Sequence, residues 1–259
     1  MALIENKFWG VEDKVQIAIE RLREFEPAEG YYLAFSGGKD SQTIYHLAQM
    51  AGVKFDAHYN LTTVDPPELV QFIRKHYPDV EVHRPDKTMW QLIVENGMPP
   101  TQLVRYCCRE LKERGGAGRL TLTGIRWQES SRRKKRNMAE ACMQDGTKRY
   151  LHPIIDWTDK DVWQFIKRVA KVPYCELYDQ GYKRLGCLGC PMGNEKAMTA
   201  QFERWPKYRA TYIRAFGRML AERDRKGLPN NSNWHTGEDV MRWWIKRKEK
   251  QTDQTVLFE

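Results

Sequence analysis

The sequence predicts an α/β fold, a doubly wound parallel sheet followed by a helical C-terminal region. Short apolar runs of strand character alternate with stretches whose apolar residues recur at helical spacing, as in sheets whose strands are joined by helices. After about residue 157 the strand patterns cease and helical patterns dominate. We therefore expect a sheet domain over residues 1–150, with a helical region over 151–259 packed beside the crevice of the sheet.

The predicted elements follow one another in a regular order. Residues 11–27 carry apolar side chains at helical spacing, and the apolar run 31–35 is a buried strand that ends at two glycines. A helical pattern resumes over 40–50, and the helix over 66–76 has a proline in its first turn, where no N–H is needed. Further strands are predicted at 54–60, 80–83 and 120–124, and further helices at 89–95, 159–169, 202–226 and 238–248.

Composition and net charge limit the class of protein and the partners to be expected. Hydrophobic residues make up 41% and charged residues 30%, which is ordinary for a soluble chain. No apolar run approaches the ~20 residues of a membrane span, and the N-terminus lacks the pattern of a secretory signal, so we expect a cytoplasmic protein without a membrane partner. The net charge of +9 favours anionic partners, either phosphorylated small molecules or nucleic acid.

The turn after the strand at 31–35 is the segment Ser36-Gly37-Gly38-Lys39-Asp40-Ser41. Two glycines let the backbone turn sharply and approach a ligand closely, and the amides with the following helix N-terminus form an anion-binding nest. Lys39 adds positive charge for a phosphate, whereas the Asp40 carboxylate tolerates phosphates only with Mg²⁺ between them. The alternative is a strand-to-helix turn that carries surface charges.

The spacing of this segment excludes two common nucleotide loops. It lacks the four residues that separate the glycines of a Walker loop, and it is not the Gly-x-Gly-x-x-Gly of dinucleotide folds. At every fixed position it resembles the PP-loop of ATP pyrophosphatases, which split ATP between the α and β phosphates. The resemblance implies that residues 1–150 form a PP-loop domain that binds an adenine nucleotide.

Four of the six cysteines form two groups, Cys107-Cys108 and Cys187-x-x-Cys190. Glycines and a proline flank the second pair, as in a metal-binding knuckle. Zinc sites usually take two spaced pairs, which adjacent cysteines fit poorly, and a [4Fe–4S] cluster also takes four thiolates. From spacing alone, structural zinc, a disulfide and buried free cysteines stay open beside the cluster.

A wider set of motifs resembles the phosphoadenylyl-sulfate (PAPS) and adenylyl-sulfate (APS) reductase family. The similarity runs from about residue 29 to 195. In the iron–sulfur members of this family the two cysteine pairs hold one [4Fe–4S] cluster, with a lysine beside it at the position of Lys112. The resemblance therefore implies that Cys107, Cys108, Cys187 and Cys190 are cluster ligands. The motifs that carry it are 105–108, 112, 123–126, 129–130, 153–158, 161–163, 172–174, 178–182 and 186–191.

Two departures from the reductase pattern shift the expected nucleotide toward ATP. The reductases end in a tail with a nucleophilic cysteine, whereas this sequence has no cysteine after Cys190. The reductases have also largely lost the intact PP-loop, which this sequence keeps. We therefore expect an ATP pyrophosphatase that adenylylates an acceptor, releases pyrophosphate and then transfers sulfur from a donor.

The resemblance also suggests roles for particular residues. Ser36, Gly37, Gly38, Lys39 and Ser41 are expected to hold pyrophosphate, and Asp40 to help place Mg²⁺. Gly124, Arg126 and Arg132, with Arg133, are expected near the α phosphate or an acidic substrate. Four thiolates leave no open iron, so a structural or electrostatic role for the cluster is favoured, with Lys112 as a nearby cation.

Two alternatives accompany this hypothesis. The first is a PAPS or APS reductase that takes its thiol from a partner protein, Cys142 or Cys175, although Cys175 fits a buried small residue better. The second is a nucleic-acid-binding accessory protein that senses nucleotide or redox state. Its basis is the basic tract 132–136 and the many aromatic residues; the competing interpretation of that tract is a solvated loop. A tRNA or DNA substrate would unite this alternative with the leading hypothesis.

Overall fold

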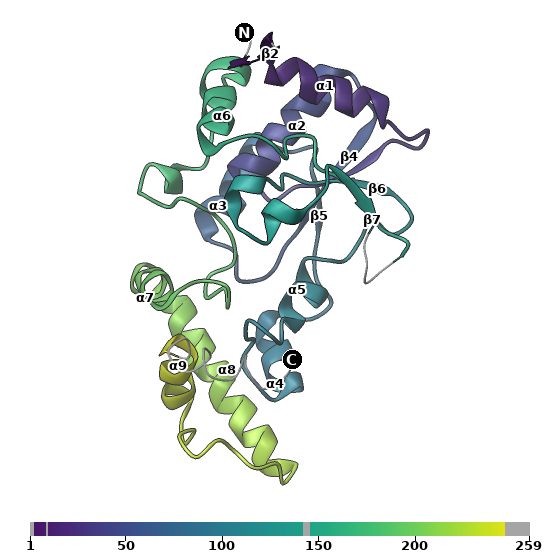
Figure 1. Ribbon diagram of the computed structural model, residues 1–259. Helices are drawn as coiled ribbons and strands as arrows, with labels where there is room; N and C mark the ends of the chain where they lie inside the picture. The colour runs from purple at the N-terminus through teal and green to yellow at the C-terminus, as the bar shows by residue number, and fades with distance from the viewer. Residues whose placement is uncertain (1–2, 9, 142–145, 247–259) are drawn as a thin grey trace. The chain divides into compact units, whose positions relative to one another are not determined.

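The computed structural model describes residues 3–8, 10–141 and 146–246 (Figure 1). The chain forms two compact units. The first comprises residues 1–60, 67–83 and 115–185, and the second comprises 61–66, 84–114 and 186–259. The units therefore do not divide at residue 150, because residues 84–114 join the C-terminal helices rather than the sheet. The expected packing of the helical region on the sheet crevice stays a prediction.

A six-stranded sheet in the order β5-β4-β3-β6-β8-β7 forms the centre of the first unit. All neighbours are parallel except β7, which pairs antiparallel with β8 at one edge. This arrangement confirms the predicted α/β fold, although the sequence patterns did not predict β7 and β8. The strands are β3 (Tyr31–Ala34), β4 (Phe55–Asn60), β5 (Glu81–His83), β6 (Leu120–Leu122), β7 (Ala139–Ala141) and β8 (Arg149–Leu151).

In the described part of the first unit, four α-helices, a π-helix, a small hairpin and three 3₁₀ turns accompany the sheet. Asp13 caps the N-terminus of helix α1, where its side chain accepts a hydrogen bond from the Val15 amide. Helix α6 is preceded by a capping box between Thr158 and Asp161. The expected helix over 159–169 becomes π-helical after Gln164. The elements are β1 (Ile4–Lys7), β2 (Gly10–Asp13), α1 (Lys14–Glu24), α2 (Lys39–Ala51), α3 (Pro67–His76), α6 (Asp159–Gln164) and the π-helix Phe165–Ala170.

The two faces of β3 have different surroundings. Tyr31 and Leu33 are fully buried, and the Tyr31 hydroxyl donates a 2.7 Å hydrogen bond to the Leu22 carbonyl of α1. Because side chains alternate along a strand, Tyr32 lies on the opposite face, where its ring stacks on His58 of β4 at 4.1 Å between centroids. One face of β3 thus contacts helix α1, and the opposite face carries the Tyr32 ring against His58.

The second unit is helical and has a core of its own around Tyr212. The Tyr212 ring lies 4.7 Å from that of Trp90 and 4.8 Å from that of Trp244. The predicted helix over 202–226 divides at Pro206, which lacks the N–H that would continue the helix. The described helices of the second unit are α4 (Met89–Asn96), α5 (Tyr106–Leu111), α7 (Glu195–Arg204), α8 (Pro206–Arg225) and α9 (Gly237–Lys246).

The last predicted helix, 238–248, matches α9 as far as residue 246, and its final two residues lie outside the described part of the chain. None of the helices that the structure describes has both the length and the apolar character needed to cross a membrane.

Candidate functional site

The loop between β3 and α2 has a backbone that only glycine permits at its second position. Gly37 has φ of +69°, and a Cβ atom there would lie 2.6 Å from the Ile73 side chain. Below the loop, the Ser41 hydroxyl donates to the Gly38 carbonyl at 2.9 Å and accepts from the Ser36 amide at 3.2 Å. The turn is thus held in a fixed shape by its own side chains.

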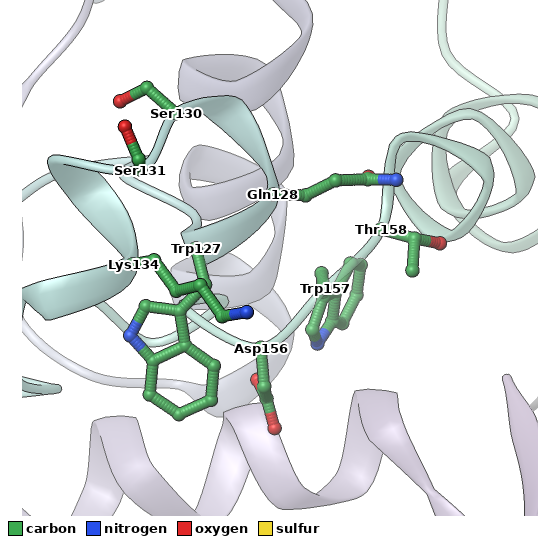
Figure 2. A pocket seen from close by; sticks show the side chains of 8 residues that line it. All are labelled: Trp127, Gln128, Ser130, Ser131, Lys134, Asp156, Trp157 and Thr158. Carbon is green, nitrogen blue, oxygen red and sulfur yellow. The ribbon is translucent and has the colours of Figure 1, made fainter.

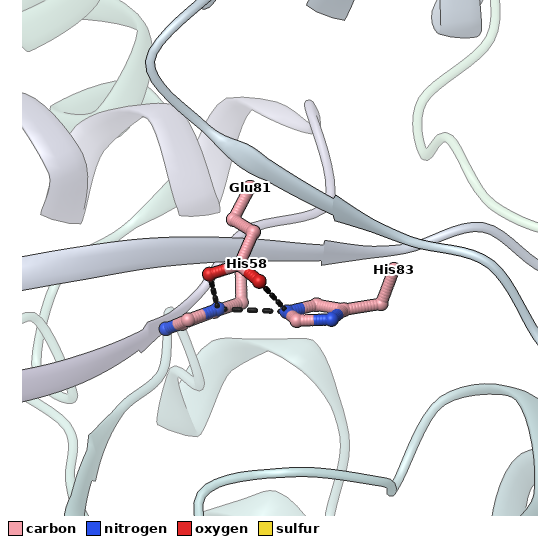
Figure 3. A group of neighbouring side chains, drawn as sticks. All are labelled: His58, Glu81 and His83. Atoms are coloured by element: carbon pink, nitrogen blue, oxygen red, sulfur yellow. Dashed lines mark hydrogen bonds and ion pairs between the residues drawn. The ribbon is translucent and has the colours of Figure 1, made fainter.

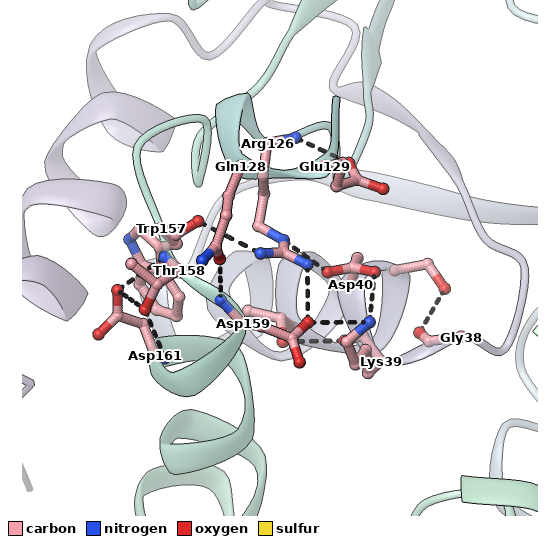
Figure 4. A network of polar contacts seen from close by, with 12 residues as sticks. Gly38, Lys39, Asp40, Arg126, Gln128, Glu129, Trp157, Thr158, Asp159 and Asp161 are labelled. Carbon is pink, nitrogen blue, oxygen red and sulfur yellow. Dashed lines mark hydrogen bonds and ion pairs between the residues drawn. The ribbon is translucent and has the colours of Figure 1, made fainter. Parts of the chain in front are cut away.

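Lys39 and Asp40 belong to a network of ion pairs with Arg126 and Asp159 (Figure 4). The Arg126 Nε donates to Asp40 at 2.7 Å, and its other nitrogens donate to Asp159 at 3.1 Å and to the Trp157 carbonyl at 3.3 Å. The Lys39 Nζ lies 3.2 Å from Asp159 and 3.4 Å from Asp40. The positive charges of Lys39 and Arg126 are therefore neutralised by the two carboxylates of the network.

Sheet topology explains why these residues meet. The chain runs outward from β3 through β4 and β5, then returns to add β6 on the other side of β3. Ligands of such sheets bind beyond the carboxyl ends of the strands, where the direction reverses. The loop with Lys39 follows β3, and Gly124 and Arg126 follow β6, so the network lies at this switch point.

The contact between the two loops depends on a second glycine. A Cβ atom on Gly124 would lie 2.8 Å from the Asp40 Cβ and 2.9 Å from its carbonyl oxygen. Real side-chain atoms do not approach so closely. The loop that follows β6 can therefore pack on the start of α2 only with glycine at position 124. Gly124 thereby sets the distance between Asp40 and Arg126.

Tyr178 contacts the loop from the 3₁₀ turn Glu176–Tyr178. Its hydroxyl accepts a 2.8 Å hydrogen bond from the Lys39 amide, and burial raises the pKa of Tyr178 above its ordinary range. The Lys39 Nζ also lies 3.3 Å from the Lys183 carbonyl. One amide of the expected anion nest is therefore already bonded to a neutral hydroxyl.

The basic tract 132–136 lies just beyond the network. Arg133 pairs with Glu129 and Arg136 pairs with Glu140, so two of its cations are neutralised within the unit. Arg132, Lys134 and Lys135 are exposed. Arg126 contacts Asp40, a pairing that the sequence did not predict, and Arg132 is exposed directly before the 3₁₀ turn Arg133–Lys135. The expected contacts of both arginines with the α phosphate or an acidic substrate stay a prediction.

A pocket of about 440 Å³ opens beside this tract (Figure 2). Trp127, which follows Arg126 directly, is 41% exposed and stands at the pocket with Lys134 and two serines. Asp156 and Thr158 line it as well and lead into Asp159 of the network. Its lining offers an aromatic face, a cation and hydroxyl groups to a ligand.

The four cysteines with family-like spacing all lie in the second unit. Cys107 and Cys108 are in α5, and Cys187 and Cys190 are in the loop before α7. Neither they nor Cys175 form a disulfide, and Cys142 lies outside the described residues. Cys175 is 1% exposed in the first unit, which confirms it as a buried small residue.

The loop with Cys187 and Cys190 is fixed by the helical core. The Leu188 amide donates to the Val64 carbonyl at 2.8 Å, and the Tyr212 hydroxyl donates to the Leu188 carbonyl at 2.9 Å. Gly189 has φ of +68°, and a Cβ there would lie 2.7 Å from the Phe202 ring and 2.8 Å from the Trp244 ring. No larger residue fits between these rings.

Electrostatics distinguish the cysteines from one another. The Cys107 thiol donates to Cys108, which lowers the pKa of Cys108 to about 6, and Lys112 lowers it further while burial opposes the shift. The same hydrogen bond raises the pKa of Cys107. Burial raises the pKa of Cys187, and its negative charge raises the pKa of Lys112. Lys112, predicted as a nearby cation, thus interacts with both cysteine groups.

Sequence reasoning missed several polar residues of these sites. Asp159 directly follows the capping residue Thr158 at a helix N-terminus, where acidic residues are common, and the sequence assigns it no functional role. Tyr178 was noticed only as part of a family motif. The group His58, Glu81 and His83 was not anticipated, although the alternation in Glu81-x-His83 places both side chains on one face of a strand.

Comparison with known proteins assigns the family. The model of the phosphoadenosine phosphosulfate reductase domain matches residues 30–192, well over half of the chain. The chain belongs to this family. An uncharacterized protein of Methanocaldococcus jannaschii is 30% identical over 66% of this chain and 43% of its own length. The adenosine 5'-phosphosulfate reductase of Oceanobacillus iheyensis is 27% identical over 58% of this chain and 63% of its own.

The chain spans about two fifths of the length of the first curated relatives that it matches. Among solved structures, the phosphoadenylyl-sulfate reductase of Candida auris is 20% identical, with 66% of this chain and 87% of that chain covered and a TM-score of 0.49. The match to the family domain includes the loop 36–41, Arg126 and all four cysteines of the second unit.

Proposed function

We propose that this member of the family is a PP-loop enzyme that cleaves ATP between the α and β phosphates and couples the cleavage to sulfur transfer. The observation that carries the proposal is the intact loop at the switch point of the sheet, with Lys39 and Arg126 converging on Asp40. Gly37 lets the loop pack against Ile73, and Gly124 lets the chain after β6 pack against Asp40, so the loop has a fixed shape at this point.

Charge balance supports a requirement for Mg²⁺. Asp40 and Asp159 neutralise Lys39 and Arg126, so an incoming triphosphate meets two carboxylates as well as two cations. A divalent cation between carboxylates and phosphates removes that repulsion. We infer that Asp40 and Asp159 bind Mg²⁺ when ATP enters, which frees Lys39 and Arg126 to pair with phosphate oxygens.

The proposed reaction has two steps. An acceptor oxygen attacks the α phosphorus, the bond from that phosphorus to the bridging oxygen breaks, and pyrophosphate leaves with the charge that Lys39 and the loop amides stabilise. A sulfide from a donor then displaces AMP: a bond forms between sulfur and the acceptor atom, and AMP leaves with the acceptor oxygen. The residues of this chain bind and orient the nucleotide and neutralise its charge in both steps.

The four cysteines of the second unit fit a [4Fe–4S] cluster. Cys107, Cys108, Cys187 and Cys190 would be its ligands, two of them from α5 and two from the loop before α7. Lys112 would offset part of the negative charge of four thiolates. With all four positions taken by protein, the cluster would supply structural cross-linking and a local charge rather than an open iron site.

The test combines product analysis with a conservative variant. With ATP, Mg²⁺ and candidate acceptors, the chain should release pyrophosphate and form AMP, and Asp40→Asn should reduce the rate by about 100-fold. Asp224→Asn, an exposed carboxylate of the second unit, is the control and should retain the rate. Release of inorganic phosphate with ADP would contradict cleavage between the α and β phosphates.

A reductase is the second candidate, because the family includes adenosine 5'-phosphosulfate reductases. Its thiol would come from a partner protein or from Cys142, which lies outside the described residues. Cys175 is buried and its burial raises the thiol pKa, both of which disfavour a nucleophile. Sulfite release from PAPS or APS in the presence of thioredoxin would favour this candidate over ATP cleavage.

An anionic acceptor is consistent with the surface near the network. Arg132, Lys134 and Lys135 are exposed beside the pocket, and the exposed Trp127 ring could stack on a base. We therefore include tRNA or DNA among the candidate acceptors. Binding should weaken with salt and should be lost when the three cations are changed to glutamine, whereas the same change at Lys207, Arg214 and Arg218 of α8 should have little effect.

A further inference from the structure

Three ligand-type side chains gather on the sheet of the first unit (Figure 3). None of them belongs to the loop 36–41 or to the cysteine pairs. His58 lies on β4, and Glu81 and His83 lie on the edge strand β5. Parallel pairing aligns His58 with Glu81, and the alternation of the strand returns His83 to the same face. One atom from each of the three lies within 4.8 Å of the other two.

The distances between these atoms are close to those around one metal ion. The His58 Nδ1 lies 3.4 Å from a Glu81 oxygen, and the His83 Nε2 lies 3.7 Å from the other. Ligands about 2.0–2.1 Å from a tetrahedral zinc are separated by about 3.3 Å. The two imidazole nitrogens are closer, at 2.8 Å, so they would move apart by about half an ångström when a metal enters.

The surroundings of His58 determine which of its two ring nitrogens faces Glu81 and His83. Its Nε2 bonds to the Asp56 carboxylate, which Arg119 holds in turn with a 2.7 Å hydrogen bond. The Tyr32 ring stacks on the imidazole with an interplanar angle of 6°. Histidine ligands of metals usually donate their second nitrogen to a carboxylate in this way, which leaves a lone pair on the other.

The converging atoms can offer lone pairs to a single cation. With Nε2–H donated to Asp56, the His58 Nδ1 presents a lone pair to a carboxylate and to a second imidazole. Without a cation only a single proton, shared between the rings, would separate these acceptors. The set of two imidazoles and one carboxylate is one that Zn²⁺ favours over Mg²⁺ or Ca²⁺.

We propose that His58, Glu81 and His83 bind one Zn²⁺ ion, or a divalent transition-metal ion of similar preference. The side chains of Glu81 and His83 are 64% and 39% exposed, so water has access to the fourth coordination position. The ion would join the edge strand β5 to β4 by bonds additional to the backbone pairing. The site is independent of the function proposed for the loop 36–41.

Zinc titration of the full chain tests the proposal. The cysteines also attract zinc, so the anaerobically purified chain with its native metal content is titrated with Zn²⁺, and the variants are compared with the wild type. We expect His83→Ala to bind one equivalent of Zn²⁺ fewer than the wild type. In Glu81→Gln the affinity of this site for Zn²⁺ should fall at least 10-fold. Asp56→Asn should lower the affinity by about 10- to 100-fold through the orientation of His58.

Two controls separate this site from other zinc sites. His235→Ala removes an exposed histidine of the second unit and should retain the equivalent. Cys187→Ser should also retain this equivalent of Zn²⁺. With Co²⁺ as the probe, the absorption bands of nitrogen-coordinated cobalt should be lost only in His83→Ala. Because Glu81 and His83 are on the surface, both variants should fold, as circular dichroism would verify. Equal zinc binding by the wild type, His83→Ala and Glu81→Gln would overturn the proposal.

Discussion

A Cβ atom on Gly124 would lie 2.8 Å from the Cβ of Asp40, so these two residues touch through their backbones across two adjacent strand ends. We expect Gly124→Ala to push Asp40 away from Arg126 and to cost about 1–3 kcal/mol of unfolding free energy, as overpacking does. The affinity for the nucleotide should fall as well. Urea denaturation and nucleotide titration measure the two effects.

The matched control is Gly217→Ala on α8. A Cβ there meets no atom within 4 Å, and alanine in a helix is more stable than glycine by about 1 kcal/mol. Gly217→Ala should therefore stabilise the protein and leave nucleotide affinity unchanged. If Gly124→Ala behaved like Gly217→Ala, the close packing of Gly124 on Asp40 would be wrong.

Arg126 is 2% exposed, and its guanidinium reaches three acceptors in different directions. A lysine has one nitrogen and cannot replace all three bonds, so Arg126→Lys should lower the unfolding free energy by about 1–3 kcal/mol. A double-mutant cycle of Arg126→Lys with Asp40→Asn should give a coupling energy of about 0.5–3 kcal/mol. Additive effects would show that the pair does not interact.

The loop 36–41 and its strand were predictable because both depend on local sequence. The apolar run before two glycines and the helical pattern after them need no distant contact. The positions of Gly124 and Arg126 followed from the family motif, and the parallel sheet order then explains why they meet Asp40. The cysteine pairs were likewise found from spacing and resemblance.

The remaining features depend on distant contacts. The helix α5 with Cys107 and Cys108 joins the C-terminal helices, which no local pattern reveals. The short strands β7 and β8 each have three residues, too few for a clear alternation. His58 and Glu81 become neighbours only through the register of β4 and β5, and one shift along the strand would separate them.

His152 predicts a specific pH dependence of stability. It is fully buried between Thr123 and Glu140, and burial lowers its pKa below the ordinary value. The unfolded state then binds the proton more readily, so stability falls as the pH drops below about 6.5, by at most about 1.4 kcal/mol per pH unit. Urea denaturation between about pH 5.5 and 7.5 measures this slope.

His46 adds to the same slope, because burial lowers its pKa too. Replacing His152 with glutamine keeps hydrogen-bonding groups in place but removes one titrating group, so the variant should show a flatter slope than the wild type. An unchanged slope would mean that His152 is not held neutral in the folded state. The carboxyl pKa of Glu140 is lowered by Arg136 and His152 against the effect of burial, and it influences only lower pH.

The cysteine site makes a prediction about metal content. Anaerobically purified protein should contain about four iron and four sulfide per chain, and Cys187→Ser should lose most of both. Cys175→Ala, which changes a buried cysteine of the first unit, should keep them. A colourless wild-type protein with one zinc per chain would contradict the cluster.

If the loop 36–41 accepts the β and γ phosphates of ATP, nucleotides with and without a pyrophosphate group should compete unequally for it. Equilibrium binding of ATP with Mg²⁺, PAPS and APS should be measured side by side on the wild type and on Lys39→Ala. We expect ATP to bind most tightly and Lys39→Ala to weaken ATP more than the sulfated nucleotides, because only ATP places a pyrophosphate group on the loop. Tighter binding of PAPS or APS, with no greater loss for ATP in Lys39→Ala, would contradict the account.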